Sequence, residues 1–437
     1  MIEIRNKQIL IDGKPQILLC GEIHYFRLRK EEWPDRIRKL KAAGMNAVAS
    51  YIPWLCHETA EGEPDLSGKT RPELDLEHFI DLCREHELYF VARPGPFVMA
   101  ELKNEGIPYW VYEKHPDIVP VTWDGKPVKT GTVDYLSPGF LQEARKWYAA
   151  VMPVLAGRLY GRGGNVIAVQ LDNEIGMLSW VSNSPDLTDI VLDDFAAWLA
   201  TKYDPTALDA RYPFLKADKD ARNRAFRTPA EEYSVQLHRD LGAYMRHRFA
   251  KYVAELRRYA EEFGVTGVPF LVNIHGTGHG RGLTFPIGIS QLYESYTQAP
   301  GYLSGSDIYF GDLNMQTFQD LYLINAFMDA VHRKEQPLTS LEFNCGDGNF
   351  GETYGGRYDP SAVDFKTRMC IAQGNRLINF YLFSGGYNYR MEYQPGDGND
   401  RIAITGERHG FAAPVGPEGQ LNYTYPRMAR VNTTAMA

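Results

Sequence analysis

The sequence predicts an α/β fold, a closed (β/α)8 TIM barrel with an insertion after the fourth strand. The first supporting observation is that short apolar runs rich in β-branched residues alternate with amphipathic helical segments, which is typical of parallel β/α units. The second is the length of 437 residues, which suits one large barrel with insertions. The third is that no G-x-G-x-x-G motif follows the first strand, which argues against a dinucleotide-binding domain.

Eight short apolar runs are the expected strands of this barrel. They are Gln16–Ile23, Asn46–Tyr51, Leu88–Arg93, Val166–Leu171, Pro269–Ile274, Asp307–Phe310, Leu338–Phe343 and Leu377–Phe383. The expected helices are Glu31–Ala43, Leu76–His86, Leu141–Leu159, Glu231–Phe263, Met315–Val331 and Ala362–Ala372. Strand and helix alternate regularly through the first four units, and this regularity favours a parallel sheet over two separate domains.

We expect residues 1–437 to form a single barrel domain with three additions. Residues 1–15 alternate apolar and polar side chains and reach an Asp12-Gly13 turn, which predicts an N-terminal β-hairpin across the bottom of the barrel. Residues 178–230 are polar and irregular apart from a helix near Asp194–Tyr203, and we interpret them as the insertion. Residues 395–437 are expected to form a C-terminal loop region.

The composition is that of an ordinary globular protein. Hydrophobic residues make up 44% of the chain, enough for a large core, and the net charge of -8 gives no reason to expect a nucleic-acid partner. No apolar stretch approaches the length of a membrane span, and the N-terminus lacks the apolar core of a signal peptide. Five scattered cysteines without a C-x-x-C pair favour reduced thiols, so we expect a cytoplasmic protein.

One stretch, Asn165–Gly176, organises the candidate chemistry. It reads NVIAVQLDNEIG, an apolar run that ends abruptly at Asn173-Glu174. Such a run predicts a buried strand of a parallel sheet, and α/β folds keep their chemistry where these strands leave the sheet. Position alone does not separate a catalytic Glu174 from a strand-end carboxylate in an ion pair.

The ends of the other predicted strands supply further polar and aromatic side chains. Together the strand ends offer His24, Tyr51, Trp54, Arg93, Asn173, Glu174, His275, Tyr309, Glu342, Asn344 and Tyr381. Because all strand ends of a barrel open on one face, Glu174 and Glu342 should meet across one mouth. Two carboxyls facing each other are what glycoside hydrolysis needs, one protonated and one ionised, with no metal or cofactor.

Several motifs then make the sequence recognisable. It resembles glycoside hydrolase family 35, the retaining β-galactosidases, over nearly the whole chain. The matching segments are GEIHYFR (21–27), YIPWLCHE (51–58), RPGPFVMAELKNEGIPYW (93–110), GGNVIAVQLDNEIG (163–176), SLEF (340–343) and NFYLFSGGYN (379–388). Several motifs in the right order are far more specific than one motif alone.

The resemblance implies a role for individual residues. Glu174 is implied to be the general acid/base, Asn173 the partner of the sugar 2-hydroxyl, and Glu342 the nucleophile. Tyr51, Ala100 and Glu101 match residues that hold the terminal sugar hydroxyls, and Tyr381 matches a tyrosine near the nucleophile. From the residues alone, a solvated Glu101 and a core Tyr381 stay open as alternatives.

Three departures from the family pattern bear on the sugar specificity. Asn344 stands where the family often has an aromatic residue, Met99 where it commonly has cysteine, and Phe411 lies in HGFAAPV (409–415), where a tyrosine-rich segment is usual. Phe411 cannot donate the hydrogen bond that a tyrosine hydroxyl would supply. We therefore count Asn344 and Phe411 among the candidate substrate-binding residues, because they bear on which terminal sugar is bound.

Some attractive features carry less weight. His275 and His279 have the spacing of metal ligands on a helix, but the glycines around them argue against a helix, so we predict no metal site. Cys345 is interpreted as a packed thiol rather than a nucleophile. Trp54 is the best candidate for a sugar-stacking tryptophan, because it follows the second strand.

The resulting expectation is a retaining exo-β-glycosidase, first of all a β-galactosidase, acting on small β-linked oligosaccharides or glycosides. The alternatives are a relative specific for another terminal sugar, such as a β-glucosaminide or β-glucoside, with hydrolysis or transglycosylation, and a non-catalytic carbohydrate-binding barrel. A small sugar is the expected partner, with no nucleic acid and no membrane, and a homo-oligomer is possible.

Overall fold

The computed structural model describes residues 1–128, 132–177, 185–275, 287–315, 317–332, 335–345, 359, 361–388, 408–410 and 412–437. Its centre is a closed barrel of eight parallel strands in the order β4-β5-β6-β7-β8-β9-β10-β11, with β11 pairing back to β4. The strands are β4 (Leu18–Ile23), β5 (Ala47–Tyr51), β6 (Tyr89–Arg93), β7 (Val166–Gln170), β8 (Phe270–Ile274), β9 (Tyr302–Ile308), β10 (Leu338–Asn344) and β11 (Asn375–Ser384). The predicted (β/α)8 fold is confirmed.

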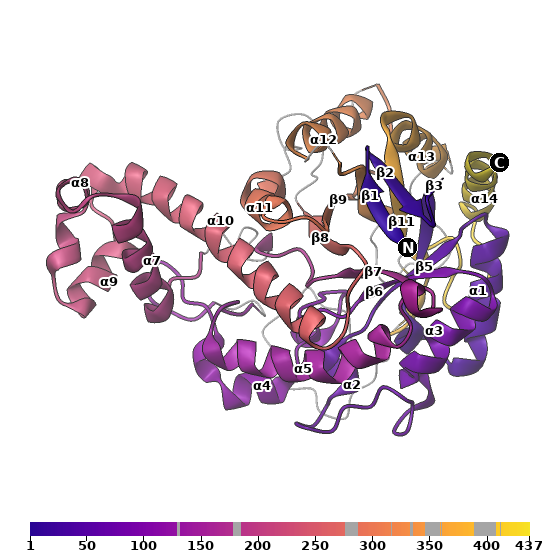
Figure 1. The fold of residues 1–437 in the computed structure, drawn as a ribbon, viewed down its shortest axis with the longest axis horizontal. Helices are drawn as coiled ribbons and strands as arrows, with labels where there is room; N and C mark the ends of the chain where they lie inside the picture. The colour runs from indigo at the N-terminus through magenta and orange to yellow at the C-terminus, as the bar shows by residue number, and fades with distance from the viewer. Residues whose placement is uncertain are drawn as a thin grey trace.

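Helices surround the barrel (Figure 1). Those that follow the strands are α1 (Trp33–Ala42), α3 (Leu76–Glu85), α5 (Pro138–Ala156), α10 (Glu231–Glu262), α11 (Ile287–Thr297), α12 (Phe318–Val331) and α13 (Ser361–Gln373), and two short helices, α2 (Trp54–His57) and α4 (Tyr109–Lys114), lie in the loops. The large apolar core lies between this helical layer and the strands. Among the described residues, no helix is both long enough and apolar enough to span a membrane.

The N-terminal segment closes the lower end of the barrel. It forms a three-stranded antiparallel sheet of β1 (Ile2–Arg5), β2 (Gln8–Ile11) and β3 (Lys14–Gln16). The structure therefore adds a third strand to the two-stranded hairpin that was expected in residues 1–15. Ile9 and Ile11 of β2 are buried against apolar side chains inside the barrel, including Leu271 and Leu303. This sheet therefore plugs the end where the strands begin.

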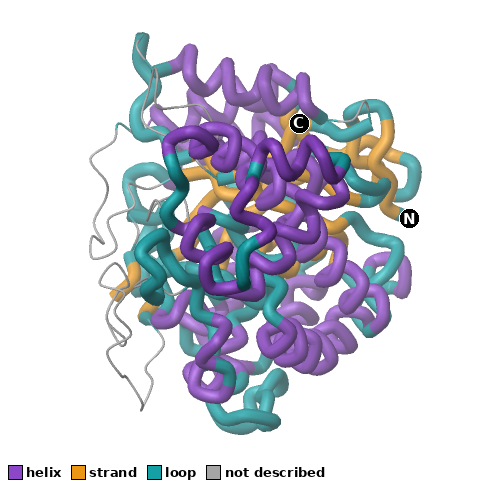
Figure 2. The backbone as a smooth tube through the Cα atoms, turned by 90° about the vertical axis from the view of Figure 1, so that its left-hand side faces the viewer, coloured by secondary structure: helices purple, strands orange, loops and turns teal. Residues whose placement is uncertain are grey.

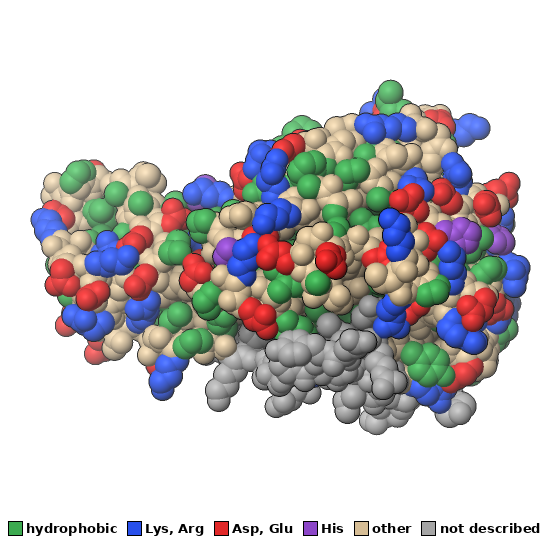
Figure 3. All heavy atoms as spheres, turned by 90° about the horizontal axis from the view of Figure 1, so that it is seen from below, with side chains coloured by type: hydrophobic (Ala, Val, Ile, Leu, Met, Phe, Trp, Pro, Cys, Tyr) green, Lys and Arg blue, Asp and Glu red, His purple; other side chains and the backbone are tan. Residues whose placement is uncertain are grey.

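The insertion after the fourth barrel strand is helical. Its helices α7 (Asp189–Lys202), α8 (Pro205–Arg211) and α9 (Lys219–Arg227) form a lobe at the far end of α10, at the left of Figure 1 and nearest the viewer in Figure 2. The lobe has its own apolar cluster, which includes Phe195, Phe226 and Leu237. The expectation of a mainly irregular segment was wrong, because short helices hid their apolar residues among many charged ones. Figure 3 shows acidic and basic side chains interspersed over the same lobe.

The C-terminal region also differs from the expected loop over residues 395–437. Its last twelve structured residues form α14 (Tyr425–Met436), which packs beside α13 (Figure 1). A two-residue strand β13 (Arg408–His409) pairs with β12 (Gly386–Tyr387) just after the last barrel strand. This pairing brings the C-terminal region back to the mouth of the barrel.

The sixth barrel strand was placed too late in the sequence. The expected span was Asp307–Phe310, whereas β9 runs from Tyr302 to Ile308. Serine and glycine fill its middle, residues 304–306, so no continuous apolar run marks it in the sequence. Close packing explains the glycine: a Cβ on Gly305 would lie 2.5 Å from Thr339 Oγ1 and 2.6 Å from the Cγ of Leu341.

Candidate active site

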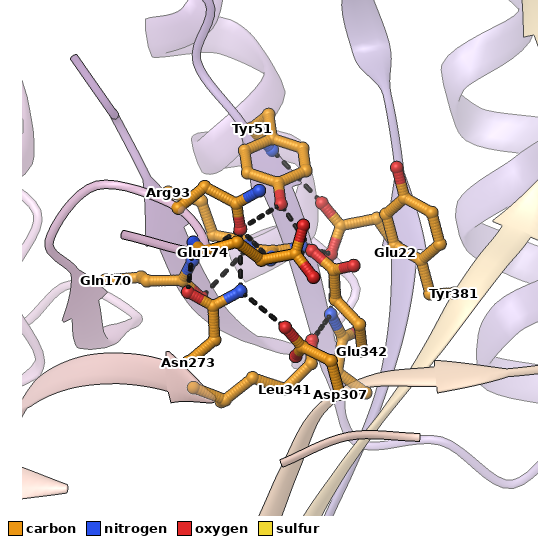
Figure 4. Close-up of polar contacts among 12 residues, drawn as sticks. Glu22, Tyr51, Arg93, Gln170, Glu174, Asn273, Asp307, Leu341, Glu342 and Tyr381 are labelled. Atoms are coloured by element: carbon orange, nitrogen blue, oxygen red, sulfur yellow. Dashed lines mark hydrogen bonds and ion pairs between the residues drawn. The ribbon is translucent and has the colours of Figure 1, made fainter. Parts of the chain in front are cut away.

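The carboxyl ends of the strands bring the predicted acids together. One carboxylate oxygen from each of Glu174, Asp307 and Glu342 lies within 4.8 Å of the others, and all three side chains are buried (Figure 4). Glu174 follows β7 and Glu342 lies near the end of β10, so the closed barrel joins positions 168 residues apart in sequence. This separation is close to the about 5–5.5 Å of retaining glycosidases and below the roughly 6.5–9.5 Å of inverting ones.

Glu342 is held by three donors. Its Oε1 accepts hydrogen bonds from the Tyr51 hydroxyl and from Nη2 of Arg93, and its Oε2 accepts one from the Tyr309 hydroxyl at 2.6 Å. The side chain is 4% exposed. Hydrogen bonds from one charged and two phenolic donors fix the orientation of this buried carboxyl. A carboxyl group held in one orientation at the mouth of the barrel is suited to nucleophilic attack.

Arg93 is the central cation of the site. Its Nη1 donates to Glu22 Oε2 at 3.0 Å, its Nε to Gln170 Oε1 at 3.0 Å, and its guanidinium lies 3.8 Å from the centre of the Tyr51 ring. Burial works to raise the pKa of Glu22, but Arg93, His24 and Asn379 lower it to about 2. Glu22 therefore stays ionised and anchors Arg93 against Glu342.

Glu174 is positioned through its backbone. Its N–H donates to Asn273 Oδ1 at 2.9 Å, and its φ of 43° lies in the left-handed region that ordinary residues rarely adopt. Asp172, two residues earlier, is also left-handed, with a φ of 61°. Left-handed backbone at non-glycine residues clusters at functional sites, where surrounding contacts impose it. This left-handed turn directs the Glu174 side chain from the end of β7 toward the mouth of the barrel.

Asn173 links the two sides of the mouth. Its Oδ1 accepts hydrogen bonds from the Tyr51 hydroxyl at 2.6 Å and from Asn273 Nδ2 at 2.7 Å, and its Nδ2 donates to the Val98 carbonyl at 3.2 Å. The carboxamide is buried between the acid/base side and the nucleophile side of the site.

The loop after β6 carries the other expected sugar-binding residues. Met99, Ala100 and Glu101 all have left-handed φ angles of 51–52°, and Arg27 fixes them by donating from Nη2 to the carbonyls of Ala100 and Glu101. Burial works to raise the pKa of Glu101, but His409, Arg27 and His24 lower it. Glu101 is thus a half-buried, ionised carboxylate, with its side chain 16% exposed, and not a solvated surface residue.

Tyr381 stands on β11 between these two groups. Its hydroxyl lies 3.5 Å from Glu101 Oε2, and its ring centre is 6.4 Å from that of Tyr309. Tyr381 is 2% exposed. The ring therefore forms the wall that joins Glu101 to the nucleophile side.

The remaining candidates are distributed differently. Asn344 has its Oδ1 3.2 Å from the Nζ of Lys366 on α13, so its described contacts run outward and not to Glu174 or Glu342. Phe411 lies outside the described residues, and so does His279. His275 is buried, with its Nε2 3.2 Å from the Ile175 carbonyl, and burial lowers its pKa to about 4.

Trp54 is not a sugar platform. It is fully buried, its Nε1 donates to Glu58 Oε2 at 2.7 Å, and its ring stacks on Trp147 at 6.1 Å. The expectation was wrong because the residue begins a short helix that turns into the core. Cys345 is a packed thiol, as expected, and contacts the Leu382 carbonyl at 2.9 Å. All five cysteines are free and buried.

Asp307 is the residue that sequence reasoning missed. It pairs in register with Glu342 and accepts a hydrogen bond from Asn273 Nδ2 at 2.8 Å. Burial and the neighbouring Glu342 and Glu174 raise the pKa of Asp307 well above its usual value. The signal was available: the same side of β9 reads Leu303, Gly305 and Asp307, an apolar start with a polar end, but the strand was placed too late.

The three carboxyls also have the spacing of a cation site. Both oxygens of Glu342 already accept hydrogen bonds, and the Arg93 guanidinium supplies a positive charge at this position. The donor set therefore suits a proton among the carboxyls better than a divalent cation, and we assign no metal here.

Curated relatives with different activities resemble this chain. It is 29% identical over 393 residues to a β-1,2-glucosyltransferase of Ignavibacterium album, covering 88% of this chain and 53% of that protein. It is 36% identical over 211 residues to an exo-β-D-glucosaminidase of Pyrococcus horikoshii, covering 46% of this chain and 27% of that protein. It is 35% identical over 175 residues to a mouse β-galactosidase, covering 40% and 24%. The chain spans about half the length of the first of these relatives.

The fold is also that of solved structures. A β-galactosidase from the psychrophilic Marinomonas ef1 superposes with a TM-score of 0.66 at 15% identity, over 96% of this chain and 60% of that one. At this identity the likeness concerns the fold alone. The family model for glycosyl hydrolases family 35 matches residues 8–245, which is more than half of the 437 residues. Together with the two facing carboxyls, this match shows that the chain belongs to glycosyl hydrolases family 35.

Proposed function

We propose that this protein is a retaining exo-β-glycosidase that removes a terminal β-linked sugar by double displacement. The observation that carries the proposal is the separation of at most 4.8 Å between oxygens of Glu174 and Glu342, across a mouth built by all eight strands. This distance is close to that of retaining enzymes and below the roughly 6.5–9.5 Å by which inverting enzymes leave room for a water molecule, so it favours direct attack by a carboxylate.

The environments of the two acids suggest their roles. Glu342, oriented by Tyr51, Arg93 and Tyr309, attacks the anomeric carbon and forms the glycosyl-enzyme. Glu174 gives its proton to the leaving oxygen and then takes a proton from the water that hydrolyses the intermediate. Asn173 lies between them and is proposed to bind the 2-hydroxyl, where a hydrogen bond that tightens in the transition state accelerates both steps.

The proposed first substrate class is a terminal β-galactoside. The buried Tyr51 and Tyr381 and the half-buried Glu101 form a polar wall beside the nucleophile, and the ionised Glu101 can accept hydrogen bonds from two sugar hydroxyls. A small glycoside or oligosaccharide is the expected partner. The five buried free thiols are consistent with a reducing cytoplasm, and we keep that location as part of the proposal.

A second candidate is transfer of a β-glucosyl residue to an acceptor sugar. It is favoured because the match to a β-1,2-glucosyltransferase spans 88% of the chain, whereas the match to a β-galactosidase spans 40%. The chemistry differs only in the last step, where a sugar hydroxyl replaces water. A cavity of about 390 Å³ beside Gly176, with Trp123 stacked on His238 at its edge, lies next to the segment that carries Glu174 and could hold an acceptor.

The test is a panel of nitrophenyl β-glycosides (galactoside, glucoside and glucosaminide), each with and without added glucose. Faster turnover of the galactoside supports the first proposal. Faster turnover of the glucoside, with disaccharide products when glucose is added, supports the second. Proton NMR of the first product should show the β-anomer, because two inversions give retention. Release of the α-anomer would overturn the mechanism, and turnover of none of the three would favour a carbohydrate-binding barrel.

A further inference from the structure

The third carboxyl of the site, Asp307, receives fewer hydrogen bonds than the nucleophile candidate Glu342 and the buried acid Asp65. Glu342 receives three hydrogen bonds, and Asp65, an acid remote from the mouth, receives four from Ser67, Lys69 and Thr70. Asp307 receives one, from Asn273 to its Oδ2. Its Oδ1 is buried and has no hydrogen-bond donor among the residues that the structure describes. An ionised carboxylate with one donor in a closed site would be strongly destabilised.

The titratable and charged groups that face Asp307 come from the neighbouring strands and from the end of its own. Glu342 on β10 and Glu174 after β7 are acidic, Tyr309 just after β9 is a neutral phenol, and Arg93 on β6 is the facing cation. Arg93 already pairs with Glu22 and Glu342. If all four acids were ionised, one guanidinium would face four negative charges. A proton on Asp307 removes one of these charges where no cation contacts it within the described part of the chain.

The surrounding acids favour the neutral form of Asp307 and leave Glu174 as its acceptor. Burial comes first among the causes that raise the pKa of Asp307, and the like charges of Glu342 and Glu174 add to it. Both oxygens of Glu342 already accept hydrogen bonds from other residues, and Glu174 is the other carboxyl of the cluster within 4.8 Å of Asp307. A neutral Asp307 is therefore placed to donate an O–H to Glu174, as neutral acids do in other apolar sites.

We propose that Asp307 is a positioning residue, a carboxylic acid kept neutral that donates a hydrogen bond to Glu174. This role rests on the proposed acid/base function of Glu174. In the first step Glu342 bonds to the anomeric carbon as the bond from this carbon to the glycosidic oxygen breaks, and the proton of Glu174 moves to that oxygen, which leaves as an alcohol. Glu342 thereby loses its charge and Glu174 gains one. The proton on Asp307 stays in place and stabilises the new carboxylate of Glu174. In the second step a water molecule gives a proton to Glu174, and the oxygen of this water bonds to the anomeric carbon. The bond between that carbon and Glu342 breaks, which restores the carboxylate of Glu342.

The experiment compares Asp307→Asn with Asp307→Ala on a β-glycoside that the wild-type protein hydrolyses. The amide of the asparagine can donate the same hydrogen bond, so Asn should lower kcat by less than about tenfold, whereas Ala should lower it by roughly ten- to hundredfold. The alkaline limb of the kcat/KM profile should stay in place for Asn, because no charge is removed. A limb that moves by a full pH unit toward acid in Asp307→Asn would show that Asp307 is ionised, and it would overturn the proposal.

A spectroscopic measurement makes the test independent of activity. Infrared difference spectra of the wild-type protein near pH 7 should contain the C=O stretch of a buried protonated carboxyl that disappears in Asp307→Asn. Absence of this difference overturns the proposal even if both variants fold poorly. Asp320 of α12 is the matched control: it is 3% exposed, its Oδ2 lacks a partner among the described residues, and Asp320→Ala should leave kcat and the pH profile unchanged. If the wild-type protein hydrolyses no glycoside, the proposed function fails, while the infrared result still decides the state of Asp307.

Discussion

The two ends of the barrel interior differ in chemistry although the same strands build both. The lower end is apolar, with Leu18, Ala47, Val91, Ala168, Leu271, Leu303 and Leu377 packed against the N-terminal sheet. The upper end, two or four residues further along each strand, holds Glu22, Tyr51, Arg93, Gln170, Asn273, Asp307 and Asn379. Inward positions on a strand repeat every second residue, so each strand changes from core to site within one or two steps.

The side chains at the two ends of the barrel interior are stabilised in different ways. At the lower end, burial of apolar surface stabilises the fold, and each side chain acts nearly independently. At the upper end every polar group depends on partners from other strands, as Asn273 does on Asn173, Glu174 and Asp307. Changes at the lower end should therefore alter stability, and changes at the upper end should alter activity.

The largest expected effect is at the nucleophile. Glu342→Gln should lower kcat by about 10⁴- to 10⁶-fold, the range seen when one member of a catalytic unit is removed, because an amide cannot form the glycosyl-enzyme. Its melting temperature should stay within a few degrees of the wild type, since the amide fills the same volume. Steady-state kinetics and thermal melts check both statements. Activity above one hundredth of the wild type would exclude Glu342 as the nucleophile.

The next largest effect is at the acid/base. Glu174→Ala should lower kcat on an unactivated glycoside by roughly 10²- to 10⁴-fold, the usual contribution of proton transfer. On a nitrophenyl glycoside, added azide should restore turnover and yield a β-glycosyl azide, because the anion can attack the intermediate without a general base. Chloride at the same concentration is the control and should not restore turnover. An azide product of α configuration, or no rescue, would contradict the assigned role.

A pair of variants on one strand tests the contrast between the apolar lower end and the polar upper end of the barrel. Leu271 and Asn273 are both inward-facing and nearly fully buried on β8. Leu271→Ala should lower the free energy of unfolding by about 2–5 kcal/mol and leave kcat of the folded enzyme unchanged. Asn273→Ala should lower kcat by roughly ten- to hundredfold with the smaller loss of stability, since it frees the backbone N–H of Glu174. Denaturant titration and steady-state kinetics on both variants measure these effects. A larger loss of kcat in Leu271→Ala than in Asn273→Ala would contradict the contrast between the two ends.

The smallest effect concerns a group outside the barrel interior. Burial lowers the pKa of His332 to about 4, and its Nε2 lies 2.7 Å from Ser304 Oγ at the lower half of β9. The unfolded chain takes up a proton near pH 6.5 and the folded chain only near pH 4, so this histidine reduces stability as the pH falls between these values. His332→Gln should make the slope of the unfolding free energy against pH shallower by about 1.4 kcal/mol per pH unit in this interval.

Comparing the two slopes cancels the contributions of all other titrating groups. Chemical denaturation at several pH values between 4.5 and 6 supplies both slopes on the same buffer series. Parallel slopes would show that His332 titrates alike in the folded and unfolded states. Activity near neutral pH serves as the control and should be unaffected, because His332 lies away from the carboxyls of the mouth.

The strands that contain a continuous apolar run were predictable from the sequence. The strand β9, which lacks such a run, was not. β5, β6 and β7 were placed to within a residue or two, because β-branched and alanine-rich runs end at clear polar signals. β9 was misplaced because its glycine and serines are chosen by close contact with β10, which no local pattern records. The helix expected near Asp194–Tyr203 corresponds to α7 (Asp189–Lys202). The helices α8, α9 and α11 were missed because their apolar faces are matched to partners distant in sequence.

The sequence by itself determined the barrel, the family resemblance, and the two acids at strand ends, because periodicity and strand-end polarity are local properties of the chain. Only the tertiary structure decided which other side chains join them. Asp307 became part of the site through its register with Glu342, Asn344 turned toward Lys366, and Trp54 turned into the core. The physical reason is that burial and hydrogen bonding act between residues close in space, and those neighbours exist only once the barrel has closed.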